Sequence, residues 1–165
     1  MAKFQFFYDY LCPHCKKGYE IMMDLISDYP DMEVQYMPIE LNPRPMANPY
    51  IQSFYIAEEL GADMKAFHST LFQKASIESQ NVRSAKVLAD ILEKIVDREK
   101  LLSIIESGKY QPKVGENNDL AYEKDNIWFL PSFRVPGLSP DSPRLDAQGG
   151  IGITPQELKD FLDKL

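Results

Sequence analysis

The chain has 165 residues, of which 44% are hydrophobic and 26% charged, as expected for one globular domain or for one domain that carries an insertion. Its formal net charge of −7 argues against nucleic acid or an anionic membrane as the main partner, because both carry negative charge themselves. No apolar run approaches the roughly 18 residues of a membrane-spanning helix. The first residues lack the pattern of a secretory signal peptide, so we expect a cytoplasmic protein, or an extracytoplasmic one if a signal has been removed.

The two cysteines of the chain, Cys12 and Cys15, lie between a predicted strand and a predicted helix. Residues 3–8 are mostly aromatic, which indicates a buried strand, and an amphipathic pattern from residue 16 to about residue 29 predicts a helix. The first N–H groups and the positive dipole end of a helix stabilise a thiolate, which is the form that attacks disulfides. Pro13 suits the first helical turn, where its missing N–H costs nothing. The pattern therefore predicts a redox dithiol.

Three other uses of a C-x-x-C pair fit the sequence less well. A structural zinc site needs about four ligands, and only His14 and His68 could join the two cysteines in the usual ligand set. A c-type haem attachment needs a histidine directly after the second cysteine, where Lys16 stands. A static disulfide across two residues closes so short a loop that it constrains little of the unfolded chain. We therefore expect neither a metal nor a cofactor.

The middle of the chain is predicted to be helical. Alternating apolar and polar residues first predict a second strand at residues 32–39, which should be parallel to the first because a helix joins the two. Three prolines then predict a loop at residues 41–49. No strand pattern occurs between about residues 42 and 126, and Asp63 and Asp97 are positioned as helix caps. The predicted helices cover residues 50–60, 63–72, 84–96 and 97–108.

The strand pattern returns near the end of the chain, at residues 132–135, where Pro136-Gly137 turns the backbone. A weaker strand pattern covers residues 144–147. The segment Thr154-Pro155-Gln156-Glu157 is a capping box that opens a last helix. The order β-α-β, a helical block and α-β-β-α is that of an α/β fold.

At this point the sequence resembles the DsbA family of thioredoxin-fold thiol–disulfide oxidoreductases. The resemblance rests on Cys12-Pro13-His14-Cys15 at the strand–helix junction, on the helical block, and on Leu130-Pro131-Ser132-Phe133 before the third strand. Further motifs look more like the FrnE-like cytoplasmic branch of that family, namely Phe7-Tyr8-Asp9-Tyr10-Leu11-Cys12, Ile39-Glu40-Leu41-Asn42-Pro43 and Gly149-Gly150.

This resemblance implies a thioredoxin-like domain made of residues 1–42 and 112–165, with residues 43–111 as an all-helical insertion. It also implies a cis peptide bond before Pro131, facing the dithiol. The cis geometry would leave the backbone of Leu130 free to pair with an extended substrate chain.

One position departs from the pattern of thioredoxin-fold enzymes. These proteins commonly bury an acid on the first strand, six residues before the first cysteine, where it handles the proton of the second cysteine. Phe6 occupies that position here. Asp9 is the nearest acid, so water or Asp9 would have to accept the proton of Cys15.

Cys12 should be the exposed nucleophile, because its sulfur lies at the helix N-terminus. Cys15, one turn into the helix, should be buried and should resolve the mixed disulfide. His14 can donate a hydrogen bond to the Cys12 thiolate, and its charged form would stabilise that thiolate further. Because a stabilised thiolate stabilises the reduced form, the Pro13-His14 pair predicts an oxidising protein.

Other residues carry weaker signals. We interpret Arg44 and Arg134 as free positive charges near loops, and His68 as a structural or exposed residue of a helix. Aromatic residues on strands and loops belong to the core more often than to a substrate site. This reservation applies to four residues that could line a substrate groove, namely Phe7, Tyr8, Tyr10 and Trp128.

The leading hypothesis is a protein thiol–disulfide oxidoreductase that acts on protein or peptide thiols and disulfides, with glutathione or a thioredoxin-type protein as recycling partner. Its net direction is open, since a reducing cytosol favours reduction or isomerisation whereas the Pro-His pair favours oxidation. One alternative is a glutathione-dependent isomerase or transferase of the kappa type, such as 2-hydroxychromene-2-carboxylate isomerase. Those relatives carry serine near the position of Cys12, and both cysteines are present here. The other alternative is a non-catalytic peptide-binding module.

Overall fold

We describe the fold from a computed structural model, which covers residues 2–41, 48–137 and 139–165. The chain begins with β1 (Ala2–Tyr8), α1 (Pro13–Ile26) and β2 (Met32–Pro38). The two strands pair in parallel along their whole length, from Ala2 opposite Met32 to Tyr8 opposite Pro38, as predicted. Helix α1 begins and ends three residues earlier than the sequence pattern indicates, because Cys12 is its N-cap and residues 27–29 form turns after it.

A run of helices follows, and the predicted caps are confirmed within it. The Asp63 and Asp97 side chains accept hydrogen bonds from the N–H groups of Ala66 and Lys100, respectively. The π-helical turns η1 and η2 have no counterpart in the sequence prediction. In chain order the elements are α2 (Pro49–Glu59), α3 (Met64–Phe72), η1 (Gln73–Ile77), α4 (Ala85–Leu92), α5 (Arg98–Ser107), α6 (Gln111–Asp119) and η2 (Leu120–Lys124).

The chain closes with β3 (Ser132–Arg134), β4 (Arg144–Asp146) and α7 (Pro155–Leu162), whose capping box at Thr154 and Glu157 is formed as predicted. The strand order in the sheet is β2-β1-β3-β4, and β3 is antiparallel to both of its neighbours. The predicted α/β order and thioredoxin-like topology are therefore confirmed. None of the helices in the described residues is long and apolar enough to cross a lipid bilayer.

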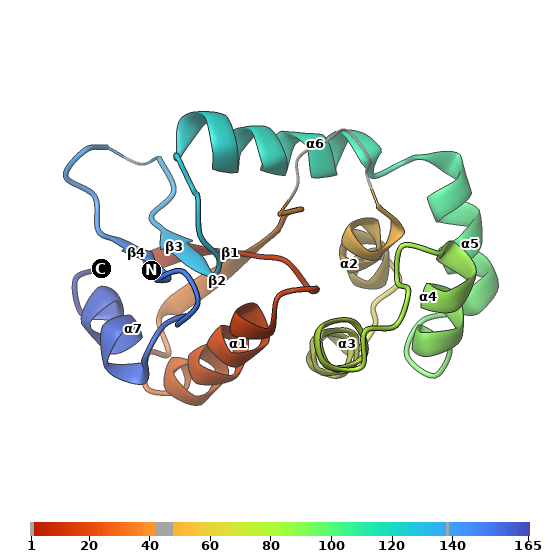
Figure 1. Cartoon of the computed structure of the whole chain (residues 1–165), viewed down its shortest axis with the longest axis horizontal. Helices are drawn as coiled ribbons and strands as arrows, with labels where there is room; N and C mark the ends of the chain where they lie inside the picture. Colours follow the sequence, from red (N-terminus) through yellow and green to blue (C-terminus); the bar gives the residue numbers. More distant parts are fainter. Residues whose placement is uncertain (1, 42–47, 138) are drawn as a thin grey trace.

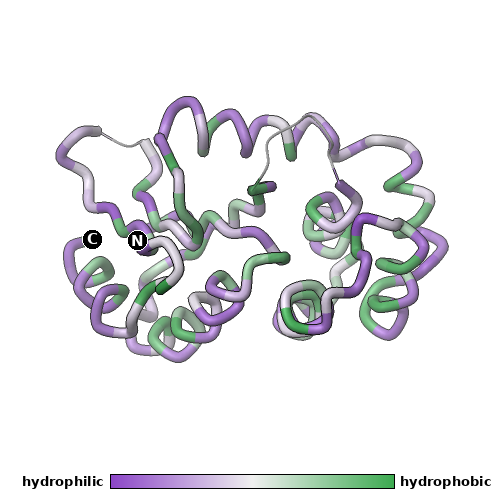
Figure 2. The backbone as a smooth tube through the Cα atoms, in the orientation of Figure 1, coloured by the Kyte–Doolittle hydropathy of each residue, from purple (hydrophilic) through white to green (hydrophobic). Residues whose placement is uncertain are grey.

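The sheet is covered on both faces. Figure 1 shows α1 and α7 on one face, α6 across the other, and α2 to α5 gathered beside one end of the sheet. In Figure 2 the hydrophobic stretches turn toward the inside of this arrangement, and the outer faces of the helices are largely hydrophilic. The division into residues 1–42, 43–111 and 112–165 stays a prediction, and its first boundary and the predicted loop fall largely on residues 42–47, outside the described residues.

An aromatic core joins the helical block to the sheet. The ring of His68, on α3, stacks on Tyr36 of β2 with 4.5 Å between the ring centroids. Its Nδ1 lies 3.0 Å from the Tyr10 hydroxyl, which is 2.8 Å from the hydroxyl of Tyr8. Phe7, Tyr8 and Tyr10 are fully buried, so these candidates for a substrate groove belong to the core, and His68 is structural.

The sequence-based interpretation of Arg134 is wrong. It is not a free charge near a loop, because it lies in β3, is fully buried, and pairs with Asp146 of β4 at 2.7 Å. A buried guanidinium needs such a partner, since leaving a charge uncompensated in the interior is costly. Arg44 lies outside the described residues.

His68 should make the protein sensitive to acid. Burial lowers its pKa from 6.5 to about 3, so the unfolded chain binds a proton near pH 6.5 that the folded chain does not bind until about pH 3. Stability from this group is therefore lost as the pH falls through that window. We expect wild type to lose about 2 kcal/mol more than His68→Phe between pH 7 and pH 4.5 in urea unfolding. Parallel pH profiles for the two proteins would contradict this account.

Candidate active site

The dithiol lies in a tight turn between β1 and α1. After Tyr8 the backbone turns so that the N–H of Cys12 donates to the carbonyl of Asp9 at 3.0 Å. Cys12 has extended backbone angles, φ −93° and ψ 115°, and Pro13 follows as the first residue of α1. Pro13 needs no hydrogen bond from its own nitrogen, so the helix can begin immediately after the first cysteine.

The sulfur of Cys12 acts as the helix cap. The N–H of Cys15 donates to the Cys12 Sγ at 3.2 Å, and the Cys12 thiol lies 3.9 Å from the carbonyl oxygen of Leu130. Both cysteines are free thiols in this structure. Cys12 is 9% exposed and Cys15 is completely buried. Cys12 is thus the more accessible sulfur, although it is not the openly exposed residue that the sequence analysis predicts.

The pKa values of the two thiols are shifted in opposite directions. The pKa of Cys12 is lowered by hydrogen bonds, first from the Cys15 side chain and then from the backbone N–H groups of Cys15 and His14. Burial and the negative charge of Asp9 act against this lowering. Burial, together with the neighbouring Cys12, raises the pKa of Cys15 well above its usual value. Cys12 is therefore the first of the two to become a thiolate.

His14 contributes its backbone to the sulfur and its ring to a neighbouring loop. The N–H of His14 is among the groups that lower the pKa of Cys12. Its ring lies against Gly152, where a Cβ would come within 3.1 Å of the ring Nδ1. Gly152 also has φ +83°, a conformation that favours glycine. The predicted hydrogen bond from the His14 ring to the Cys12 thiolate stays a prediction.

The segment before β3 covers the dithiol. The peptide bond between Leu130 and Pro131 is cis, as the family resemblance implies. The Pro131 ring packs directly on Gly18 of α1, and the Pro131 carbonyl accepts a hydrogen bond from the N–H of Ala147 at 3.0 Å. Pro131 is thereby held against α1 and the chain after β4, and the carbonyl of Leu130 before it lies toward Cys12.

The position six residues before Cys12, where thioredoxin-fold enzymes commonly bury an acid, holds Phe6. Asp9 is the acid that lies in the dithiol turn. Phe6 stacks between Tyr8 and Phe133, with ring centroids 4.7 Å and 5.2 Å away, so this point of the sheet is apolar. Asp9, which the sequence analysis names as the nearest acid, is almost completely buried. Its carboxylate accepts a hydrogen bond from the N–H of Leu11 within the dithiol turn.

An apolar surface lies next to the dithiol, and it includes Trp128 and Leu130, both of which the sequence predicts as candidate substrate contacts. The indole of Trp128 is 73% exposed, and Phe129 and Leu41 are exposed too. A hollow of about 350 Å³ opens there. Leu41, Tyr122 and Ile127 carry no sequence signal for a binding site. The hollow is lined by Leu41, Tyr122, Ile127, Trp128 and Leu130, so it reaches the segment that contacts Cys12.

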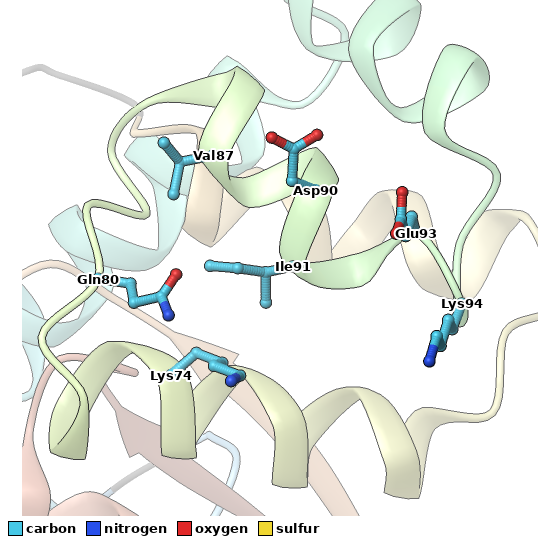
Figure 3. Close-up of a pocket in the computed structure, with 7 residues that line it drawn as sticks. All are labelled: Lys74, Gln80, Val87, Asp90, Ile91, Glu93 and Lys94. Atoms are coloured by element: carbon cyan, nitrogen blue, oxygen red, sulfur yellow. The ribbon is translucent and has the colours of Figure 1, made fainter.

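A second hollow, of about 570 Å³, lies in the helical block and has no part in this chemistry. Figure 3 shows Ile91 pointing from α4 toward Lys74 and Gln80, with charged side chains around the rim. Its lining includes no cysteine or histidine. Within the part of the chain that the structure describes, no group of three or more histidine, cysteine or acidic side chains could hold a metal ion.

Comparison with known proteins agrees with the fold. Residues 3–60 match the family model of the DSBA-like thioredoxin domain. The uncharacterized protein YwbO of Bacillus subtilis matches at 25% identity. The match covers 77% of this chain and 83% of that protein. The DsbA family resemblance is therefore confirmed, whereas assignment to its FrnE-like branch stays a prediction.

Solved structures resemble the whole chain. BdbD of Bacillus subtilis, in its oxidised form, has a TM-score of 0.72 at 20% identity, covering 99% of this chain and 86% of that one. DsbA of Pseudomonas aeruginosa has a TM-score of 0.70 at 23% identity, covering 98% and 80%. Reduced DsbA1 of Neisseria meningitidis has a TM-score of 0.69 at 18% identity, covering 99% and 83%. At such identities the likeness shows the fold.

Two helical glycines offer a matched test of the packing over the dithiol. A Cβ on Gly18 would lie 2.8 Å from the Pro131 Cγ, whereas a Cβ on Gly115 of α6 would meet nothing within 4 Å. We expect Gly18→Ala to lower the free energy of unfolding by about 1–3 kcal/mol through overpacking. Gly115→Ala should raise it by up to about 1 kcal/mol, because alanine favours the helix. Urea unfolding measures both, and equal effects would show that Pro131 does not pack tightly on α1.

Proposed function

We propose that this chain, which carries a DsbA-like thioredoxin domain, is a protein thiol–disulfide oxidoreductase with Cys12 and Cys15 as its redox centre. The observation that carries the proposal is the position of the Cys12 sulfur. It caps the N-terminus of α1, accepts the N–H of Cys15 at 3.2 Å, and is the more accessible sulfur of the pair. A helix N-terminus favours a thiolate, and a thiolate is the form required for disulfide exchange.

In the reducing direction, the Cys12 thiolate attacks one sulfur of a substrate disulfide. A bond forms between Cys12 and that sulfur, and the other substrate sulfur leaves as a thiolate, which takes up a proton. Cys15 then loses its proton and attacks the Cys12 sulfur, so that the Cys12–Cys15 disulfide forms and the second substrate thiolate is released. The substrate gains two electrons and the protein loses two. Oxidation of a substrate dithiol runs through the same steps in reverse.

The burial of Cys15 supports this order of steps. Its pKa is raised well above the usual value by burial, so it remains protonated while Cys12 attacks. After the mixed disulfide has formed, Cys15 has only to reach the sulfur one helical turn away. Cys12 is therefore the nucleophile and Cys15 the resolving residue. Pro13 and His14, which lie between them, form the start of α1.

The substrate is an extended polypeptide segment next to a cysteine. The carbonyl of Leu130 faces the Cys12 thiol, so a chain that pairs with the Leu130 backbone would bring its own sulfur to Cys12. The hollow beside Trp128 would accept an apolar side chain of the same segment. We propose glutathione or a thioredoxin-type protein as the recycling partner, in the cytoplasm. The lowered pKa of Cys12 favours oxidation of the substrate and a reducing cytoplasm favours its reduction, so the potential decides the direction.

Trapping the mixed disulfide tests this function. Cys15→Ser, exposed to oxidised glutathione or to a peptide disulfide, should accumulate a covalent adduct on Cys12, because the resolving thiol is missing. Cys12→Ser should form far less adduct, since the remaining thiol is buried. Intact mass and peptide mapping measure both. Equal trapping in the two variants would contradict the roles assigned here.

Turnover separates the remaining alternatives. Reduction of protein disulfides should fall to the uncatalysed rate in Cys12→Ser. If wild type also shows no catalysis while an unfolded peptide still binds near Trp128, the chain is a binding module and the oxidoreductase proposal fails. Glutathione-dependent turnover by Cys15→Ser would instead indicate chemistry of the kappa type.

A further inference from the structure

Asp9 brings a buried negative charge to the dithiol turn. Its side chain is 1% exposed, although it carries a carboxyl group three residues before Cys12. Its oxygens accept three hydrogen bonds, from the Leu11 N–H at 2.9 Å, the Leu41 N–H at 3.0 Å and the Tyr50 hydroxyl at 3.0 Å. Two of these partners are backbone N–H groups, which can only donate and therefore favour the ionised carboxylate. Burial raises the pKa of the Asp9 carboxyl, and the three hydrogen bonds act against that rise.

These hydrogen bonds connect three parts of the fold. Leu11 belongs to the dithiol turn, Leu41 follows the end of β2, and Tyr50 lies in the first turn of α2. The Asp9 backbone is engaged as well. Its carbonyl accepts from the Cys12 N–H at 3.0 Å, and a hydrogen bond from the Asp9 backbone acts to lower the pKa of Cys15 against the larger effect of burial. One residue therefore holds both cysteines and anchors them to the strand end and the helical block.

In the part of the chain that the structure describes, the Asp9 carboxylate has no cationic partner at close range. Among the described residues, no ion pair reaches its carboxylate, and the Arg83 charge acts on it only from a distance. A second acid, Glu40, accepts a hydrogen bond from the Asn48 N–H at 2.8 Å and lies close enough for the Asp9 charge to raise its pKa, after burial, the largest cause. Tyr50 and Tyr122 also lie close enough to be affected by the Asp9 charge. A carboxylate in such a place must act on the sulfurs beside it.

We propose that Asp9 is a positioning residue that moderates the oxidising power of the dithiol: its hydrogen bonds fix the turn, and its buried charge disfavours a thiolate at Cys12. This inference rests on the proposed function and deepens it. The helix N-terminus and the hydrogen bonds to Cys12 favour the thiolate and hence the reduced form of the protein. The Asp9 carboxylate disfavours the thiolate and hence the reduced form. The Cys12–Cys15 disulfide should then be a weaker oxidant than its Cys-Pro-His-Cys sequence suggests. The charge of Asp9 acts to raise the pKa of both cysteine thiols, which is the direction that this inference requires.

Asp9→Asn removes the charge and keeps the shape of the side chain. We expect the pKa of Cys12 to fall by about one unit, which is a tenfold change in thiolate formation. The equilibrium with reduced and oxidised glutathione should shift by a similar factor toward the reduced protein. The pH dependence of Cys12 alkylation measures the first effect, and the redox equilibrium measures the second. If Asp9→Asn does not fold, Asp9→Ser removes the same charge and its hydroxyl can still accept from the Leu11 N–H.

Tyr50→Phe is the matched control, because it removes one hydrogen bond to Asp9 and keeps the charge. It should lower the urea midpoint, as Asp9→Asn does, but leave the pKa of Cys12 and the glutathione equilibrium nearly unchanged. A shift in Tyr50→Phe equal to that in Asp9→Asn would overturn the role of the charge. If the wild-type protein exchanges with glutathione but the uncharged Asp9 variant has the same redox potential as wild type, only this inference is overturned. A wild-type protein that shows no exchange would overturn the proposed function and this inference with it.

Discussion

The hydrogen bond from the Cys15 N–H to the Cys12 sulfur is the interaction on which the rest of the site depends. It requires Cys12 to cap α1, and this in turn requires the backbone to turn within three residues of the end of β1. The cap leaves one sulfur partly accessible and buries the other completely. The proposed difference between a nucleophilic Cys12 and a resolving Cys15 therefore follows from where α1 begins.

The aromatic core explains why the turn is held in one place. The residues on both sides of Asp9, Tyr8 and Tyr10, are fully buried, and their hydroxyl groups bond to each other and to His68 of α3. The helical block thus shares its core with the sheet at the point where the dithiol turn begins. Side chains that could have been read as a substrate groove serve to fix the backbone, and the exposed apolar surface lies elsewhere, around Trp128.

Local signals explain what could be predicted from the sequence. Helix caps such as Asp63 and Thr154 act on N–H groups two or three residues away, so their spacing alone identifies them. The parallel pairing of β1 and β2 follows from the helix between them. The cysteine pair was recognisable because a strand, a proline and a helix pattern surround it.

Long-range contacts explain what could not be predicted. The burial of Arg134 depends on Asp146, which reaches it only through the pairing of β3 and β4. The surroundings of Asp9 depend on Leu41 and Tyr50, about thirty and forty residues away along the chain. Apart from Tyr122 of η2, the residues that line the apolar hollow near Cys12 lie in loops, which show no periodicity. Patterns within a short window carry no information on such contacts.

The proposed function requires that Cys12 and Cys15 interconvert reversibly between dithiol and disulfide. The most direct measurement is the fraction of oxidised protein at equilibrium in a series of glutathione buffers, read by thiol alkylation and mass. We predict a single two-electron couple between about −270 mV, the value for thioredoxin, and about −120 mV, the value for DsbA. Thiols that stay unoxidised across all these buffers, or a disulfide that never reduces, would contradict the account.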